Sequence, residues 1–271
     1  MKITITDDFD PEKIIHSGQC FRASMHNETT YQFITGKQIL HLTRLNNTTW
    51  QGNCTKAQWQ KIWEPYFDLS FNYKNIRKQI PANDIFLQKA ATYGKGLRIL
   101  RQDPFEMIIT FIISQRKSIP AIKSAVNSLC IKAGTPFKKG NTTYYTFPSP
   151  DALKKLSLED LTACSLGYRA KYIYHTVRMI TSRKIDLSAL YDLSDEQLHD
   201  ILCTLPGVGH KVAHCISLFA FHRLNSAPVD VWINRVIEKH YEGQNPFPAY
   251  PYAGIMQQYM FYYAQTKKMR P

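Results

Sequence analysis

The chain has 271 residues, 44% of them hydrophobic and 20% charged, a composition that suits one large or two modest globular domains and excludes a disordered chain. Its net charge is +13, and because residues 1–72 hold seven basic and seven acidic residues, the whole excess lies in residues 73–271. A basic part beside a neutral part favours a polyanionic partner, although a solubilising surface would give the same charge.

The first third of the chain is predicted to form strands. Residues 2–51 alternate β-branched or aromatic residues with polar ones, and turn residues separate the runs 31–34, 39–42 and 48–50, which predicts an antiparallel meander. Thr55 is expected to cap a helix that Pro65 ends or kinks. We therefore predict an N-terminal antiparallel β domain over residues 1–70.

The remainder, residues 71–271, is predicted to be helical. Asp103 and Pro104 form a helix start with a cap and a proline at the first helical position, and Ser194 caps another helix that leads into a glycine-rich hairpin. The predicted elements are helices from 83 or 84 to 91, 105–114, 119–133, 149–156, 168–183, 194–202, 231–240 and 250–268, with an extended segment over 141–147.

The stretch LPGVG, residues 205–209, predicts a tight hairpin between two helices, and we place this helix-hairpin-helix at about 196–222. Gly207 and Gly209 permit positive φ and a close approach of a ligand to the backbone. The helix that follows presents free backbone N–H groups, which is a ready site for an anion such as a DNA phosphate. Beyond it, Asp230 stands where the cap of the next helix belongs.

The cysteines and the N-terminal residues indicate the cellular compartment. The six cysteines are scattered, and we find no CxxC motif and no Cys/His pair with zinc spacing. Reduced thiols in a cytosol are therefore expected. The first residues, MKITITDDFDPEK, lack the apolar core of a signal peptide, and the longest apolar run, 107–113, is too short to span a bilayer. We expect a cytoplasmic protein associated with the nucleoid and with no membrane partner.

Five separated motifs resemble the 8-oxoguanine DNA glycosylase/lyase family of the helix-hairpin-helix superfamily, the bacterial or archaeal type. They are SGQCFR (17–22), LRQDP (100–104), LGYRAKY (166–172), LPGVGHK (205–211) with APVDV (227–231), and PYAG (251–254) followed by Gln257 and Phe261. The resemblance implies an α+β fold in which a small antiparallel sheet domain precedes a two-part helical domain that binds DNA.

By this resemblance Lys211 is the catalytic amine and Asp230 the catalytic carboxylate. A lyase needs a neutral primary amine to attack the sugar C1′, and both the positive end of a helix and burial disfavour an ammonium. The alternatives are a lysine that only binds phosphate and an aspartate that only caps a helix. As a catalytic group, Asp230 would place negative charge against a sugar that becomes oxocarbenium-like.

The resemblance also implies a pocket for a base flipped out of the duplex. Phe261 would stack on the base, Gln257 would bond its Watson–Crick edge, and Cys215 would form the opposite wall. The carbonyl of Gly18 would accept a hydrogen bond from N7–H of 8-oxoguanine, whereas guanine has an acceptor at N7. From residues alone, core packing is the favoured interpretation of Phe261, because aromatic residues crowd the same helix, and Gly18 could be a turn glycine.

DNA contacts are carried over in the same way. Tyr168 would wedge into the duplex gap, Arg169 would face the orphaned base, and Trp232 joins Gly207 and Gly209 as DNA-binding residues. The carbonyls of Cys203, Leu205 and Val208 could hold a monovalent cation, Na+ or K+, as in relatives. No cofactor is required, and the four clustered cysteines of the iron–sulfur relatives are absent after Cys215.

The segment 114–121, SQRKSIPA, departs from the family pattern. Where the family has an asparagine and, a few residues later, an arginine that contact the orphaned cytosine, this chain has Arg116 and Ala121. Arg116 and Lys117 are expected to bind the gap and its phosphates without reading sequence.

The function expected is base-excision repair of 8-oxoguanine in duplex DNA, with β-elimination, by a monomer with weak opposite-base preference. The alternatives are a glycosylase of the same fold for alkylated purines, which does not need Lys211, and a non-catalytic helix-hairpin-helix DNA-binding protein, which needs neither Lys211 nor Asp230.

Overall fold

The computed structural model describes residues 1–268. Its contacts divide the chain into two compact units: the first holds residues 1–32, 40–101 and those from 222 onward, and the second holds 33–39 and 102–221. These units do not follow the predicted division at residue 70. The reason is that α5 (Ile85–Tyr93) packs against α14 (Ala253–Thr266), so the segment up to residue 101 belongs to the same unit as the residues from 222 onward.

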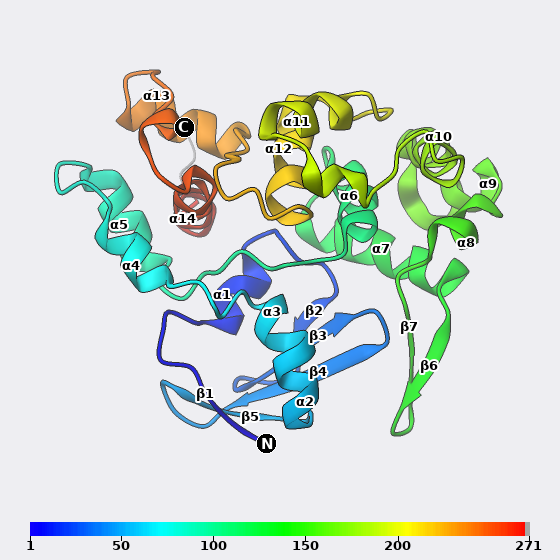
Figure 1. Cartoon of the computed structure of the whole chain (residues 1–271), viewed down its shortest axis with the longest axis horizontal. Coiled ribbons are helices and arrows are strands. Elements are labelled where there is room, and N and C mark those ends of the chain that lie inside the picture. The colour runs from blue at the N-terminus through cyan, green and yellow to red at the C-terminus, as the bar shows by residue number, and fades with distance from the viewer. Residues whose placement is uncertain (269–271) are drawn as a thin grey trace. The chain divides into compact units, whose positions relative to one another are not determined.

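A five-stranded sheet is formed by β1 (Lys2–Thr4), β2 (Ala23–Met25), β3 (Thr30–Thr35), β4 (Gln38–Arg44) and β5 (Thr49–Gly52) (Figure 1). Its order is β1-β5-β4-β3-β2, so four consecutive strands form a meander and β1 is added beside β5. Ile3 pairs with Trp50 in the antiparallel β1–β5 ladder, and Thr43 pairs with Gln51 in the β4–β5 ladder. The predicted antiparallel sheet is confirmed.

Trp50 anchors the side of the sheet that is packed. Its side chain is fully buried, the ring of Phe9 meets it edge-on at 5.3 Å, and the guanidinium of Arg44 lies 4.8 Å from its centroid. One short helix, α1 (Pro11–His16), interrupts the region predicted as strands only. Asp10 caps it and Pro11 occupies its first turn, a start signal that the β-branched pattern on both sides concealed.

The first unit also holds helices of very different length. Thr55 forms a capping box with Gln58, as predicted at the cap, but Pro65 lies in the first turn of a new helical segment rather than ending the helix. These elements are α2 (Lys56–Gln58), a π-helical turn (Trp59–Trp63), α3 (Glu64–Tyr66), α4 (Tyr73–Lys78), α5, α13 (Val231–His240), a 3₁₀ turn (Phe247–Ala249) and α14.

The second unit is organised around α6 (Pro104–Ser114), which is buried on nearly all sides and contacts α7, α10 and α12. The rings of Phe111 and Phe219 stack at 5.3 Å between α6 and α12. Its other elements are α7 (Ile119–Ala133), β6 (Pro136–Lys139), β7 (Thr142–Tyr145), α8 (Pro150–Lys154), α9 (Leu158–Leu161), a π-helical turn (Thr162–Leu166), α10 (Arg169–Thr181), a 3₁₀ turn (Ala189–Asp192), α11 (Asp195–Cys203) and α12 (His210–Phe219).

The two helix starts in this unit that were predicted from a capping residue are confirmed. The Asp103 side chain accepts a hydrogen bond from the Glu106 N–H, and Ser194 forms a capping box with Gln197. The extended segment 141–147 is confirmed by β7, which pairs with β6 as a two-stranded ribbon (Figure 1).

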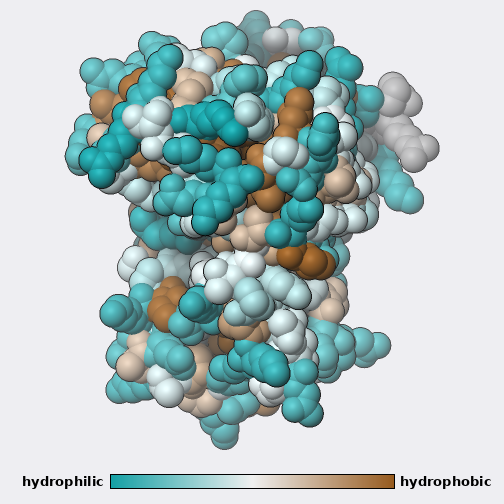
Figure 2. Space-filling model, turned by 90° about the vertical axis from the view of Figure 1, so that its right-hand side faces the viewer, coloured by the Kyte–Doolittle hydropathy of each residue, from teal (hydrophilic) through white to brown (hydrophobic). Residues whose placement is uncertain are grey.

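No helix within residues 1–268 combines the length and hydropathy needed to cross a bilayer. Figure 2 shows one face of the molecule on which hydrophilic residues predominate and hydrophobic residues form small, separated groups. This face therefore offers no broad apolar seam of the kind that obligate partners bury.

Candidate DNA-repair site

The hairpin between α11 and α12 contains two glycines with different physical requirements. Gly207 has φ of +77°, and a Cβ there would lie 2.3 Å from the Tyr172 ring, so both its conformation and its packing demand glycine. Gly209 has ordinary φ, and nothing lies within 4 Å of a Cβ built on it. The space beside Gly209 is therefore open to a ligand that approaches the backbone.

Gly209 is also the N-cap of α12, and it supplies no side-chain bond to the first-turn N–H groups. Such groups carry the positive end of the helix dipole and favour an anion. Lys211 is exposed in the same first turn. Cys215, one turn later, is only 4% exposed and lies among the apolar residues of the helix. The hairpin thus presents backbone donors and one primary amine at one end of α12.

The segment before α10 presents an exposed aromatic ring on a rigid base. Tyr168 is 50% exposed, yet the Arg169 guanidinium lies 4.3 Å from its ring centroid and the Tyr172 ring meets it edge-on at 5.8 Å. A held but projecting ring is the form that a wedge into a base step requires.

Arg169 is itself only 7% exposed. Its Nε and Nη2 donate to the carbonyl of Gln115, and its Nη1 donates to that of Leu166 at 3.3 Å. These bonds use three of the five guanidinium N–H groups and join the wedge to the end of α6. In this structure Arg169 therefore braces Tyr168 and bonds carbonyls of its own chain, rather than projecting outward as a side chain that faces an orphaned base would.

Arg116 stands in the loop between α6 and α7 with φ of +49°, and its side chain is exposed. The left-handed region disfavours arginine and tolerates asparagine. The neighbouring Lys117 donates from Nζ to the carbonyl of Ser165 at 2.7 Å, which ties this loop to the segment that carries Tyr168. The 115–118 loop and the segment that carries Tyr168 are therefore connected within the second unit.

In the first unit, Asp230 caps α13. Its Oδ1 accepts a hydrogen bond from the Ile233 N–H at 2.9 Å, as the sequence predicts for a cap. The carboxylate remains partly exposed, and so does Trp232, whose ring lies 5.3 Å from the guanidinium carbon of Arg235. The cap bond holds the carboxylate at the start of α13.

The helix α14 carries Gln257 and Phe261 one turn apart. Gln257 is 2% exposed, and its Oε1 accepts from Gln258 Nε2 at 3.0 Å. Phe261 is half-buried, in contrast to Tyr259 and Met260, which are fully buried. A ring that is neither in the core nor fully exposed suits a stacking surface for a planar ligand.

Gly18 has φ of +76° and lies in a loop that Gln19 locks in place. Gln19 is fully buried. Its Nε2 donates to Ser17 Oγ and to the Arg98 carbonyl, at 2.8 and 2.9 Å, and its Oε1 accepts from the Leu100 N–H at 2.9 Å. Gln19 therefore fixes the direction in which the Gly18 carbonyl points.

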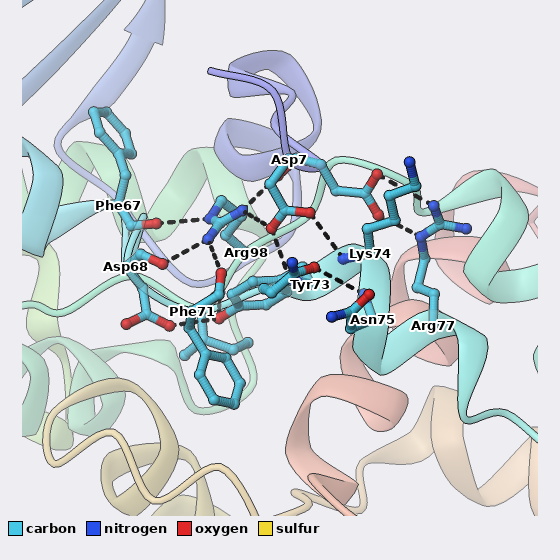
Figure 3. Close-up of polar contacts among 12 residues, drawn as sticks. Asp7, Phe67, Asp68, Phe71, Tyr73, Lys74, Asn75, Arg77 and Arg98 are labelled. Atoms are coloured by element: carbon cyan, nitrogen blue, oxygen red, sulfur yellow. Dashed lines mark hydrogen bonds and ion pairs between the residues drawn. The ribbon is translucent and has the colours of Figure 1, made fainter. Parts of the chain in front are cut away.

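Arg98, whose carbonyl accepts from Gln19, is itself held by its side chain (Figure 3). It is fully buried and stacks 4.2 Å from the Tyr73 centroid. All five of its N–H groups find oxygens: Phe67 O at 2.9 Å, Asp7 Oδ2 at 3.0 Å, Asp8 O at 2.7 Å, Asp68 O at 2.5 Å and Phe71 O at 2.6 Å. A buried guanidinium with every donor satisfied is rigid, because removing any partner leaves a buried charge poorly compensated.

Asp68 extends this network. Burial raises the pKa of its carboxyl, but the contacts with His222 and Arg101 outweigh burial, so the pKa lies below its usual value. Tyr73 donates to Asp68 Oδ2 at 3.1 Å and accepts from the Ile99 N–H at 3.0 Å. Ile99, which lies between the two residues that Gln19 bonds, is thus held through its backbone by the Tyr73 hydroxyl.

Replacing Gln19 with leucine is expected to lower the free energy of unfolding by roughly 2–4 kcal/mol, because it leaves the buried Arg98 carbonyl and Leu100 N–H without their partner. Urea denaturation measures this change. Gln60→Leu, at an exposed glutamine of the same unit, is the matched control and should stay within about 0.5 kcal/mol of the parent. Equal stability of both variants would contradict a locking role for Gln19.

The structure groups the predicted residues by unit. Lys211, Cys215 and the hairpin glycines share α12 and its start, while Arg116, Lys117, Tyr168 and Arg169 form the loop and wedge of the same unit. Gly18, Asp230, Trp232, Gln257 and Phe261 belong to the first unit. Sequence analysis missed the roles of Gln19 and Arg98 in holding the Gly18 loop. Gln19 lies within the motif SGQCFR, and Arg98 lies two residues before the motif LRQDP.

A helix-hairpin-helix with an open glycine at the start of its second helix, a lysine in the first turn of that helix and an aspartate capping the following helix defines a DNA-repair protein of the helix-hairpin-helix class. A family model for the 8-oxoguanine DNA glycosylase N-terminal domain matches residues 2–108, and one for HhH-GPD superfamily base excision DNA repair proteins matches residues 109–248, just over half of the chain. The chain belongs to this superfamily and, within it, to the 8-oxoguanine DNA glycosylase family.

Known relatives agree with this assignment. The structure of Clostridium acetobutylicum 8-oxoguanine glycosylase/lyase, bound to double-stranded DNA with cytosine opposite 8-oxoguanine, is 31% identical with a TM-score of 0.92, covering 99% of this chain and 98% of that one. A probable N-glycosylase/DNA lyase of Methanothermobacter thermautotrophicus is 30% identical over 67% of this chain. The N-glycosylase/DNA lyase of Saccharomyces cerevisiae is 32% identical over 65% of it. The matched parts span only 64% and 50% of these two curated proteins.

Proposed function

We propose that this protein is a base-excision repair enzyme that removes 8-oxoguanine from duplex DNA and then cleaves the strand by β-elimination. The observation that carries the proposal is the exposed Lys211 amine in the first turn of α12, two residues after the open Gly209. A hairpin that only binds phosphate does not need a primary amine there, and a glycosylase that activates water does not need one either.

In the proposed reaction, neutral Lys211 Nζ attacks the sugar C1′ as the C1′–N9 bond to the base breaks. One proton of the attached amine then passes to O4′ as the C1′–O4′ bond opens, which gives an iminium, and the released base anion takes a proton from water. The iminium makes the C2′ proton acidic, and loss of that proton expels the 3′ phosphate by β-elimination. Hydrolysis of the remaining Schiff base returns the lysine. The donors at the start of α12 support a nearby phosphate throughout, because they are fixed by the helix and need no reorganisation.

Asp230 is proposed to stabilise the positive charge that develops on the sugar as the base leaves. Its capping bond to the Ile233 N–H holds the carboxylate in one orientation. A preorganised charge that faces developing charge is among the largest catalytic contributions known. Asp230 can therefore cap α13 and act in catalysis with its side chain in the same position.

Recognition of the lesion is proposed to rest on the Gly18 carbonyl, which accepts from N7–H of 8-oxoguanine and repels the N7 acceptor of guanine. Gln257 would bond the Watson–Crick edge, Phe261 would stack on the ring, and Cys215 would contact the base as well. The support for Gly18 is the Gln19–Arg98 network, since selection by a single carbonyl requires that its direction does not vary.

A monovalent cation is proposed at the hairpin carbonyls of Cys203, Leu205 and Val208. Cys203 lies in the last turn of α11, where helix carbonyls have no partner four residues on. Hard backbone oxygens suit Na+ or K+, which would sit between the hairpin and a DNA phosphate. The chemistry itself requires no cofactor, and we propose a monomer with DNA as its partner.

The activity is tested by single-turnover incubation of the full chain with duplexes that carry 8-oxoguanine, guanine or 3-methyladenine at one position. We expect release of 8-oxoguanine with strand cleavage, and no release of guanine. Release of 3-methyladenine without strand cleavage would support the alternative glycosylase for alkylated purines. DNA binding with no release from any duplex would support a binding module only.

Opposite-base choice is expected to be weak. Excision of 8-oxoguanine opposite the four bases should differ by no more than about tenfold, because one base-edge reader contributes roughly 1–3 kcal/mol and Ala121 has no side chain that can supply one. Single-turnover rates on four otherwise identical duplexes measure this. A preference for cytosine of a hundredfold or more would contradict the prediction and make Arg116 the reader.

Ala121→Arg is expected to raise the cytosine preference by restoring the missing donor at the start of α7. The control is Ala133→Arg, which adds the same charge at the far end of the same helix and should strengthen binding to all four duplexes alike. Identical behaviour of the two variants would show that position 121 does not face the orphaned base.

A further inference from the structure

A cluster of metal-binding side chains lies on the two helices that flank the hairpin. His199 and Cys203 are one turn apart on α11, and His210 and His214 are one turn apart on α12, so each helix carries an i, i+4 pair. The two helices pack against each other. Ligand atoms of His199, Cys203 and His210 all lie within 4.8 Å of one another.

The separations are close to those that a tetrahedral ion would impose. His199 Nε2 lies 3.4 Å from His210 Nδ1 and 3.9 Å from Cys203 Sγ. Zinc bonds of about 2.05 Å to nitrogen and about 2.3 Å to sulfur place tetrahedral ligand atoms about 3.3 Å (N to N) and about 3.6 Å (N to S) apart. Shifts of a few tenths of an ångström would therefore suffice at these two pairs.

The surroundings of His199 also fit. Its other ring nitrogen, Nδ1, lies 3.6 Å from Asp200 Oδ1, so a small rotation of the exposed Asp200 side chain would let the carboxylate orient a metal-binding imidazole. The His199 side chain is 18% exposed, so an ion can enter and is still partly shielded. The His214 ring centroid lies 4.8 Å from that of His199, which makes it the nearest candidate for a fourth ligand.

We propose that His199, Cys203 and His210 bind one borderline-soft divalent ion of the Zn2+ class, with His214 or water as the fourth ligand. The ion would join α11 to α12 across the hairpin and stabilise it, through side chains that the glycosylase chemistry does not use. Thiolate and imidazole ligands select this class over Mg2+ or Na+. The site is therefore distinct from the monovalent cation proposed at the hairpin carbonyls.

The expectation of no Cys/His pair with zinc spacing rested on the spacing of cysteines along the chain. His199–Cys203 and His210–His214 are each separated by three residues and lie on consecutive helices joined by a tight hairpin. The hairpin brings the two pairs together, and the spacing along the chain alone does not show this proximity.

The test is titration of the full chain with Co2+, whose absorption reports tetrahedral geometry and whose near-ultraviolet charge-transfer band reports a thiolate ligand. We expect one equivalent to bind, Zn2+ to displace it, and Zn2+ to raise the melting temperature. Cys203→Ser should lose the charge-transfer band, and His199→Gln and His210→Gln should each weaken binding at least tenfold. Cys54→Ser, outside the cluster, should behave as the parent.

His210 is exposed in the first turn of α12, so His210→Gln remains informative if Cys203→Ser fails to fold. An unchanged cobalt spectrum and affinity in His210→Gln would overturn the proposal. So would failure of the parent to bind Co2+ or Zn2+ at equimolar concentration. Because the readout is metal binding, neither result bears on the proposed glycosylase activity.

Discussion

Lys211→Gln is expected to abolish strand cleavage and to slow base release by roughly a thousandfold or more, because the attacking amine is removed while the hairpin is kept. Lys211 is exposed in the first turn of α12, so its loss creates no cavity and should leave the melting temperature within about 2 °C of the parent. Single-turnover base release and strand cleavage on an 8-oxoguanine duplex measure the two steps separately.

The control for Lys211 is Lys154→Gln, which removes an exposed lysine from α8 in the same unit and should leave both rates near those of the parent. If Lys211→Gln cleaved the strand at the parent rate, the amine would come from elsewhere and Lys211 would be a phosphate-binding residue only. Loss of cleavage with unchanged base release would make Lys211 the lyase residue but not the group that drives excision.

Asp230→Asn is expected to slow base excision by roughly a hundredfold to a thousandfold without unfolding the protein. Asparagine caps helices about as well as aspartate, so the bond to the Ile233 N–H should persist while the charge is lost. Thermal melting and single-turnover excision are measured on the same preparation. An excision rate near that of the parent would leave Asp230 as a cap only.

Asp103→Asn is the matched control for this change. Asp103 caps α6 by the same chemistry, accepting from the Glu106 N–H at 2.8 Å. It should keep both the melting temperature and the excision rate. A comparable loss of excision in Asp103→Asn would show that the effect is not specific to the charge at Asp230.

The parts of the fold that were predictable from the sequence are those that neighbours along the chain specify. Caps such as Asp103, Ser194 and Asp230 lie within three residues of the N–H groups that they satisfy, so their positions could be read directly. The helix α1 was missed because it has only six residues, too few to show a helical period, although Asp10, Pro11 and Glu12 mark its start.

The supports of the candidate site were not predictable in the same way. Gln19 and Leu100 bond across 81 residues, and Arg98 reaches Asp7 across 91. No periodicity encodes such pairs, because they depend on how the sheet loop packs on the segment before α6. Burial of Arg169 was likewise hidden, since a basic residue beside a glycine in a DNA-binding motif is expected to face the ligand.

The central claim is that Lys211 forms a Schiff base with DNA, and borohydride reduction tests it most directly. The full chain is incubated with an 8-oxoguanine duplex and borohydride, and the covalent protein–DNA complex is digested to map the modified residue. The account predicts one complex, linked through Lys211, and none with an undamaged duplex. Excision without any trapped complex, or linkage through another lysine such as Lys117, would contradict it.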